Sequence, residues 1–156
     1  MGIQLLYWTW TRSPYVGAFF AYRTVNIKDT APDAKVRIFK LDGSEWHKIN
    51  TFVIGLYPVP PSVVIMDAIP LDNPRAIPQQ ALCTFTSVDD VESHIESKEL
   101  INRKKILEVI DLPASARKEI FNDLSLMGIT AGGLFPGIDG ACEAFREQNF
   151  NLMSQY

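Results

Sequence analysis

The segment that leads into Ser13 and Pro14 constrains the fold of this chain more than any other feature. Residues 1–10 are mostly apolar or aromatic, whereas chain ends are usually polar. Ser13 is suited to cap a helix, and Pro14 fits the first helical position, where a missing N–H costs nothing. We therefore expect a buried strand, a turn and an apolar helix, with a further segment upstream packed against them.

The next two elements follow from periodicity. Val16, Phe19 and Phe20 stand at helical spacing after Pro14, which extends the predicted helix. Apolar and basic residues alternate over 35–41, as on a half-buried strand, and an Asp-Gly pair then marks a turn. Three small residues on the helix are expected to let another backbone come close: Gly17, Ala18 and Ala21.

Prolines dominate the middle of the chain. They exclude regular structure until a buried strand over 62–66, and they predict an extended, stiff segment over 68–78. Residues 52–56 fit either a short strand or an ordered loop. A further strand follows over 80–86, and a polar helix then runs to about residue 97. Its predicted start is a capping box formed by Ser87 and Asp90.

The last third combines one strand with helices. Residues 104–110 alternate as a strand, and Pro113 opens a helix that Gly128 ends as a left-handed cap. A second helix covers about 139–148. We predict one α+β domain over residues 1–156, with a mixed part at 1–110 and a helical part at 111–156. Its expected architecture is a small mixed or antiparallel sheet, a capping helix after the N-terminal motif and a C-terminal helical pair.

Charge and composition narrow the classes of function. The 156 residues carry a net charge of -3, and the densest basic run, residues 103–105, is too short for a nucleic-acid footprint. No apolar run reaches the roughly 20 residues that span a bilayer, and no signal peptide is recognisable, so we expect a cytoplasmic protein. Cys83 and Cys142 have no metal-ligand spacing. We expect two reduced, buried thiols and no metal site.

Two polar segments suit an anionic ligand. The first lies before the predicted helix, whose N-terminal N–H groups and dipole favour negative charge. The second adds a cation and two amides on the proline-rich segment. The candidate ligand-binding residues are Thr9, Thr11, Arg12, Ser13, Arg75, Gln79 and Gln80.

Four of these candidates also have a structural interpretation. Ser13 is suited to be only a helix cap. Gln79 and Gln80 can satisfy backbone groups, and Arg75 can form an ion pair with Asp67 or Asp72. Three further interpretations complete this set: Trp8 and Trp10 pack in a core or edge, His47 and His94 are solvated, and residues 132–137 form a structural turn.

Three segments together resemble the FRG-domain family, named for a Phe/Tyr-Arg-Gly motif. They are residues 5–21, residues 73–84 with their Arg-Ala-Ile-Pro-Gln-Gln string, and residues 106–150. The family motif itself is absent, and Tyr7 stands where the family has an acidic residue. Ala81 and Cys83 replace a Gly and a Phe. The resemblance implies the C-terminal two-thirds of such a domain.

The order of these motifs is similar to an ADP-ribosyltransferase layout, by analogy. That layout implies NAD as cofactor, yet Gln79 or Gln80 stands where a carboxylate is wanted, and Gln is no general base at neutral pH. Catalytic residues therefore stay unassigned, and whether the chain is an enzyme stays open. The alternatives are an inactive truncated remnant or a non-catalytic module that docks a partner or its own copy through Ile3, Leu5, Leu6 and Trp8.

Overall fold

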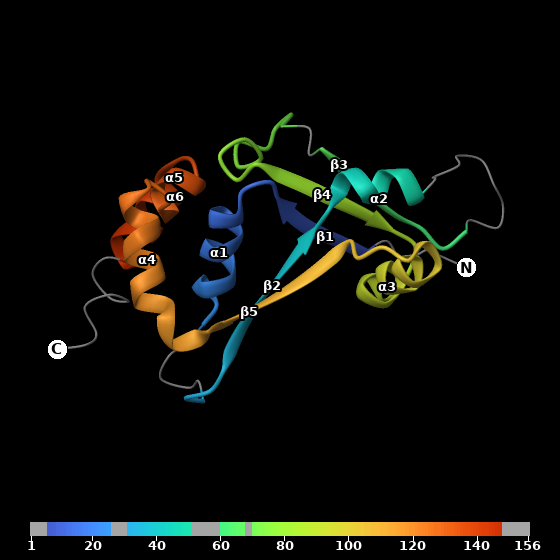
Figure 1. Cartoon of the computed structure of the whole chain (residues 1–156). Coiled ribbons are helices and arrows are strands. Elements are labelled where there is room, and N and C mark those ends of the chain that lie inside the picture. The colour runs from blue at the N-terminus through green and yellow to red at the C-terminus, as the bar shows by residue number, and fades with distance from the viewer. Residues whose placement is uncertain (1–5, 26–30, 51–59, 68–69, 148–156) are drawn as a thin grey trace. The chain divides into compact units, whose positions relative to one another are not determined.

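Helices and small sheets share the chain, as the predicted α+β class requires. The computed structural model describes residues 6–25, 31–50, 60–67 and 70–147, with side chains from residue 10 onward (Figure 1). The strands are β1 (Leu6–Thr11), β2 (Lys35–Leu41), β3 (Val63–Asp67), β4 (Ala81–Thr86) and β5 (Leu107–Pro113). The helices are α1 (Pro14–Arg23), α2 (Gly43–Ile49), α3 (Val91–Asn102), the short 3-10 turn η2 (Ala114–Ala116), α4 (Arg117–Leu126), α5 (Ala131–Leu134) and α6 (Ile138–Arg146).

The chain forms two compact units, each assembled from three segments. The first unit takes residues 1–10, 39–67 and 82–110, and the second takes residues 11–38, 68–81 and 111–156. One sheet has the strand order β1-β4-β3, and the other pairs β2 with β5. The β3 and β4 strands run antiparallel. The predicted boundary between 110 and 111 is one of the points where the chain passes between units; the prediction of a single domain stays a prediction.

The core of the first unit is built around Trp46. Its side chain is 1% exposed, and its indole N–H donates to the carbonyl of Val63 at 3.1 Å. The buried residues around it come from β3, from α3 and from the start of β5: Val63, Ile65, Val91, Ile95, Ile106 and Leu107. This core therefore joins the helices α2 and α3 to the strand β3 and the start of β5.

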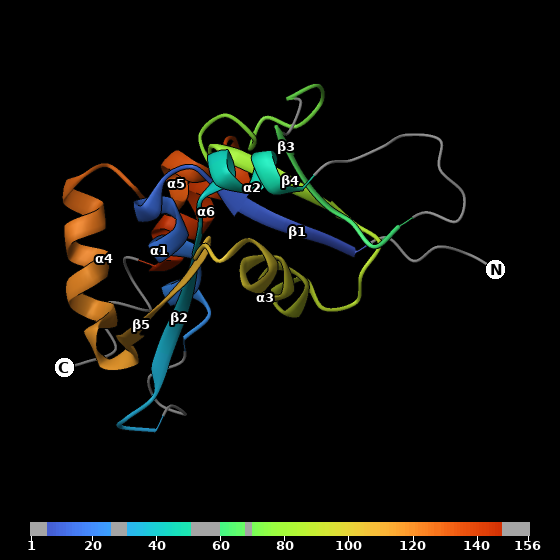
Figure 2. The same ribbon diagram turned by 45° about the vertical axis from the view of Figure 1, so that its right-hand side comes forward.

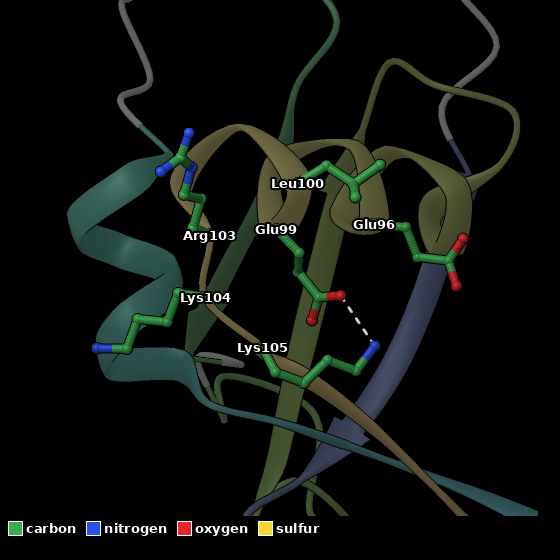
Figure 3. A pocket seen from close by; sticks show the side chains of 6 residues that line it. All are labelled: Glu96, Glu99, Leu100, Arg103, Lys104 and Lys105. Atoms are coloured by element: carbon green, nitrogen blue, oxygen red, sulfur yellow. Dashed lines mark hydrogen bonds and ion pairs between the residues drawn. The ribbon is translucent and has the colours of Figure 1, made fainter.

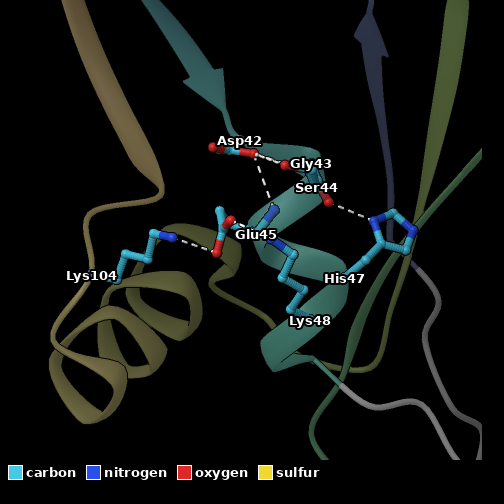
Figure 4. A network of polar contacts seen from close by, with 7 residues as sticks. All are labelled: Asp42, Gly43, Ser44, Glu45, His47, Lys48 and Lys104. Carbon is cyan, nitrogen blue, oxygen red and sulfur yellow. Dashed lines mark hydrogen bonds and ion pairs between the residues drawn. The ribbon is translucent and has the colours of Figure 1, made fainter.

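The helix α2 corrects the prediction of a simple turn at Asp42 and Gly43. One carboxylate oxygen of Asp42 accepts the backbone N–H groups of Ser44 and Glu45, both at 3.1 Å (Figure 4). The Ser44 hydroxyl donates to the same oxygen at 2.7 Å, and its hydrogen bond is the main cause that holds the pKa of Asp42 below its ordinary value. The Asp-Gly pair thus begins a helix, because Asp is a strong N-cap.

The helix α3 begins and ends later than predicted. Asp90, rather than Ser87, is its cap, and the Asp90 carboxylate accepts the backbone N–H of Ser93 at 3.0 Å. The helix continues beyond Ser97 to Asn102. The prediction of a solvated His94 is wrong, because its Nε2 is buried without a hydrogen-bond partner in the described part of the chain and its ring meets Trp46 edge-on, with centroids 6.1 Å apart.

The second unit packs α1 against α4, as Figures 1 and 2 show. Phe19 and Tyr22 of α1 are fully buried. The Tyr22 hydroxyl donates to the carbonyl of Pro113 at 2.9 Å, and burial raises the pKa of this hydroxyl. The α4 helix ends as predicted: Gly128 has φ of +77°, in the left-handed region that favours glycine.

Close backbone packing occurs at Gly140, whereas a Cβ on Gly17 of the predicted small-residue flank would meet no backbone atom outside its own helix within 4 Å. A Cβ on Gly140 would lie 1.7 Å from the carbonyl oxygen of Phe135, so this position excludes any side chain. A Cβ on Gly17 would meet only the Thr11 methyl, at an ordinary 3.6 Å. The predicted turn over 132–137 also contains the short helix α5, which Thr130 caps through a hydrogen bond from the Gly133 N–H.

The structure also tests the predictions for the two cysteines and for the strand over 104–110. Both cysteines are free, as predicted, but Cys142 is exposed and Cys83 only half-buried. The predicted strand over 104–110 lies three residues later, as β5. Residues 52–56 and the apolar positions Ile3 and Leu5 lie outside the described residues. In the described part of the chain, no helix combines the length and apolar character needed to cross a bilayer.

Candidate functional site

The turn before α1, residues 11–13, is held by its own side chains. The Thr11 hydroxyl accepts the backbone N–H of Ser13 at 3.1 Å, and the Ser13 hydroxyl accepts that of Val16 at 3.4 Å. The Ser13 carbonyl also accepts the Gly17 N–H at 3.0 Å. The prediction of Ser13 as helix cap is confirmed. Because Pro14 has no N–H, few donors of this helix end remain for an anion.

The segment 75–80 is folded on itself and not extended as predicted. The Asn73 side chain accepts the Arg75 N–H at 3.2 Å, and Gln79 and Gln80 each donate their backbone N–H to a carbonyl three or four residues earlier. Gln80 has φ of +48°, in the left-handed region. Proline at 74 and 78 fits these turns as well as an extended chain, because its fixed φ is common to both.

These two segments bond directly to each other. The Thr11 hydroxyl donates to the Gln79 carbonyl at 2.8 Å, and the backbone N–H of Arg12 donates to the Gln80 carbonyl at 3.1 Å. The sequence separates these partners by 68 positions, yet six of the seven predicted site residues come together here. Thr9 lies on β1, outside the residues whose side chains the structure describes.

The side chains of the 75–80 segment continue toward α5. The Gln79 amide donates to the carbonyl of Leu134 at 3.0 Å. The Arg75 guanidinium lies over the ring of Phe135, 5.3 Å from its centroid. Arg23 approaches the same ring at 4.6 Å. Phe135 is therefore a shared platform for two cations, and the sequence did not single it out because cation and ring are 60 or more positions apart.

A second charged cluster ties α1 to α6. Arg23 pairs with Glu143 at 2.7 Å and with Glu147 at 3.2 Å. Burial raises the pKa of Glu147. Burial also favours the neutral form of Glu143, but hydrogen bonds from Arg23 and Arg146 outweigh it and hold the pKa of Glu143 below its ordinary value. These charges compensate one another, so we assign this cluster to packing.

The geometry therefore divides the predicted residues by role. Thr11, Ser13 and Gln79 use their side chains in hydrogen bonds within the protein. Arg12, Arg75 and Gln80 are exposed to solvent, and Arg75 also contacts Phe135. The exposed guanidiniums can bind phosphate or carboxylate groups bidentately. No group of three or more His, Cys, Asp or Glu side chains suited to a metal ion occurs among the described residues. Comparisons with protein-family models, with curated proteins and with solved structures found no match.

Proposed function

We propose that the second unit binds an anionic, nucleotide-type ligand such as NAD at the surface where residues 11–13 meet residues 75–80. The bonding between these two segments carries the proposal, because it holds Arg12 and Arg75 on one framework. Two guanidiniums match the geometry of a diphosphate. Tyr15, in the first turn of α1 and 52% exposed, offers a ring on which a base can stack.

The proposed activity is binding and not group transfer. Gln79 already donates its amide to Leu134, and an amide is no general base at neutral pH. The hydroxyls of Thr11 and Ser13 are likewise engaged. Membership of the FRG-domain family and an ADP-ribosyltransferase-like layout belong to the same proposal, which rests for them on the motif resemblance.

A thermal melt with and without NAD tests the proposal. Ligand at a hundred times its Kd adds about 2.7 kcal/mol, which raises the midpoint by roughly 5–10 °C in a protein of this size. Arg12→Ala and Arg75→Ala should each weaken binding by about 10–100-fold, since each removes a charge-assisted contact. Lys118→Ala, an exposed cation on α4 of the same unit, is the matched control.

Either of two outcomes would contradict the proposal. One is a wild-type midpoint that saturating NAD does not move. The other is equal loss of affinity in the Lys118 control and in the arginine variants, which would indicate a general charge effect instead of a site. Lysine replacements at Arg12 and Arg75 refine the result, because Lys keeps the charge but lacks the bidentate fork.

A further inference from the structure

A surface pocket of about 490 Å³ lies at the carboxyl end of α3, in the first unit. Figure 3 shows Arg103 and Lys104 at one end of it and Glu96 at the other. The remaining lining residues are Glu99, Leu100 and Lys105. The proposed nucleotide site uses none of these residues, so this pocket is an independent feature.

The floor of the pocket is fixed by Glu99, which is 8% exposed. One of its carboxylate oxygens accepts the backbone N–H groups of Ile106 and Leu107 at 2.5 and 2.6 Å, and the other pairs with Lys105 at 2.9 Å. Burial favours the neutral form of Glu99, but these bonds outweigh it and keep its pKa below the ordinary value. Glu99 is therefore occupied, and it holds the following residues rigidly against α3.

Arg103 occupies a position that normally takes glycine. It follows the last residue of α3 with φ of +53°, and its backbone N–H bonds the Glu99 carbonyl. Most side chains avoid this left-handed conformation, and an outlier of this kind is a reason to look for a function. The Arg103 guanidinium forms no hydrogen bond or ion pair with any residue that the structure describes. Within the described part of the chain, Arg103 thus holds a charge without an ion pair at a position that favours glycine.

The neighbours of Arg103 complete a surface of mixed character. Lys104 is held by Glu45 at 2.6 Å, and this contact is the main cause that lowers the pKa of Glu45. Leu100, one helical turn before Arg103, is 80% exposed, and Ile101 beside it is 75% exposed. Arg103 therefore follows an uncovered apolar side chain by three positions, and the exposed Glu96 offers hydrogen-bond acceptors at the other end of the pocket.

We propose that this pocket binds an extended segment of another protein that carries an acidic side chain two positions before an apolar one. The guanidinium of Arg103 matches the carboxylate, and Leu100 matches the apolar side chain. Side chains two positions apart on an extended chain share one face and lie about 7 Å apart, so both can face two residues that line the same pocket. Glu96 accepts backbone N–H groups but repels phosphate, so the charges favour a peptide over a polyanion or an anionic membrane.

Fluorescence anisotropy with a labelled peptide of Glu-Ser-Leu-Ser repeats tests the proposal on the full chain. Arg103→Gly should weaken binding about tenfold or more and, because glycine relieves the strained backbone, raise the thermal midpoint by about 1–2 °C. Loss of binding in a more stable variant separates recognition from folding. Leu100→Ser should also weaken binding, whereas Lys118→Ala should leave it unchanged.

Three outcomes would overturn the proposal. The first is equal binding of a Lys-Ser-Leu-Ser peptide, which would show apolar adhesion without charge recognition. The second is an Arg103→Gly variant with wild-type affinity. The third is tighter binding to phosphatidylserine vesicles than to the acidic peptide, with the same dependence on Arg103, which would assign the surface to lipid.

Discussion

Among the described residues, each unit buries one charged side chain, and the two have different hydrogen-bond partners. In the first unit Glu99, 8% exposed, receives two backbone N–H groups and Lys105. In the second unit Arg117, 9% exposed, donates to the Tyr22 carbonyl at 3.2 Å and lies over the Phe121 ring at 4.8 Å. Glu99 and Arg117 are thus equally buried, but the charged group of Glu99 makes more hydrogen bonds than that of Arg117 does. Hydrogen bonding, more than exposure, decides whether a buried charge is stabilised.

The pKa values express the same difference. The pKa of Glu99 is lowered although burial acts to raise it, so its charged form is favoured in the folded state. The pKa of Arg117 is also lowered, but by burial, so its charged form is disfavoured. We therefore expect removal of Glu99 to cost much more than removal of Arg117.

The largest effect is expected for Glu99→Ala. The N–H groups of Ile106 and Leu107 lose their acceptor inside the protein, and each unsatisfied donor costs about 1–3 kcal/mol. We expect a loss of about 3 kcal/mol in the free energy of unfolding, measured by urea denaturation. Glu99→Gln keeps an acceptor and should lose less. A Glu99→Ala variant within 1 kcal/mol of the wild type would break the comparison between the units.

Arg117→Met should cost about 1–2 kcal/mol in the same assay. The variant loses the hydrogen bond to Tyr22 and the contact with Phe121, but it also removes a charge that burial disfavours. Met fills similar volume, so the packing term stays small. A loss equal to that of Glu99→Ala would mean that the guanidinium is better compensated than its single bond to Tyr22 suggests.

The residues that follow two helices extend the comparison, because Arg103 lies directly after α3 and Gly128 two positions after α4, both with positive φ. Gly128→Ala should destabilise by about 1 kcal/mol, since a Cβ there meets nothing within 4 Å and only the backbone is strained. Arg103→Gly should stabilise by about 0.5 kcal/mol, the smaller gain reflecting the greater freedom of glycine when unfolded. Thermal unfolding of both variants measures these changes in stability. If both substitutions stabilise the protein, or both destabilise it, this account is wrong.

The smallest effects are expected from pH. His94 has its pKa lowered from 6.5, mainly by burial, so the folded state binds fewer protons and stability falls as pH drops below 6.5. Glu147 in the second unit has its pKa raised from 4.5 by burial, so its contribution is lost as pH rises above 4.5. His94→Phe should flatten the pH dependence just below 6.5, and Glu147→Gln should reduce the loss of stability that begins above 4.5. Denaturation at a series of pH values checks both.

Sequence patterns correctly predicted the helices and strands whose ends are determined by residues close by in the sequence. The alternation over 35–41 gave β2 with its observed ends, and Ser13 and Gly128 mark helix ends because their effects act within one turn. The helix α2 was missed because Asp-Gly is common both in turns and at helix starts. Strand β5 was placed three residues early, since its start is set by Glu99 and not by its own alternation.

The candidate site was predictable only in part, because its contacts join residues that are far apart in the sequence. Motif order identified the 11–13 and 75–80 segments, and the structure joins them through hydrogen bonds between residues 68 positions apart. The order of the motifs could not reveal that Gln79 donates to Leu134 or that Arg75 stacks on Phe135. Such contacts depend on tertiary packing, which the spacing of residues along the sequence does not predict. Arg103 was noticed only as part of a basic run.

The position of the aromatic residues has a spectroscopic consequence. The three tryptophans of the chain, Trp8, Trp10 and Trp46, all belong to the first unit, whereas Tyr15 and Tyr22 belong to the second. Emission excited at the red edge of the indole band therefore reports on one unit alone, and far-ultraviolet dichroism reports on both. Coincident transitions in the two signals would mean that the units unfold together, and separate transitions would give each its own stability.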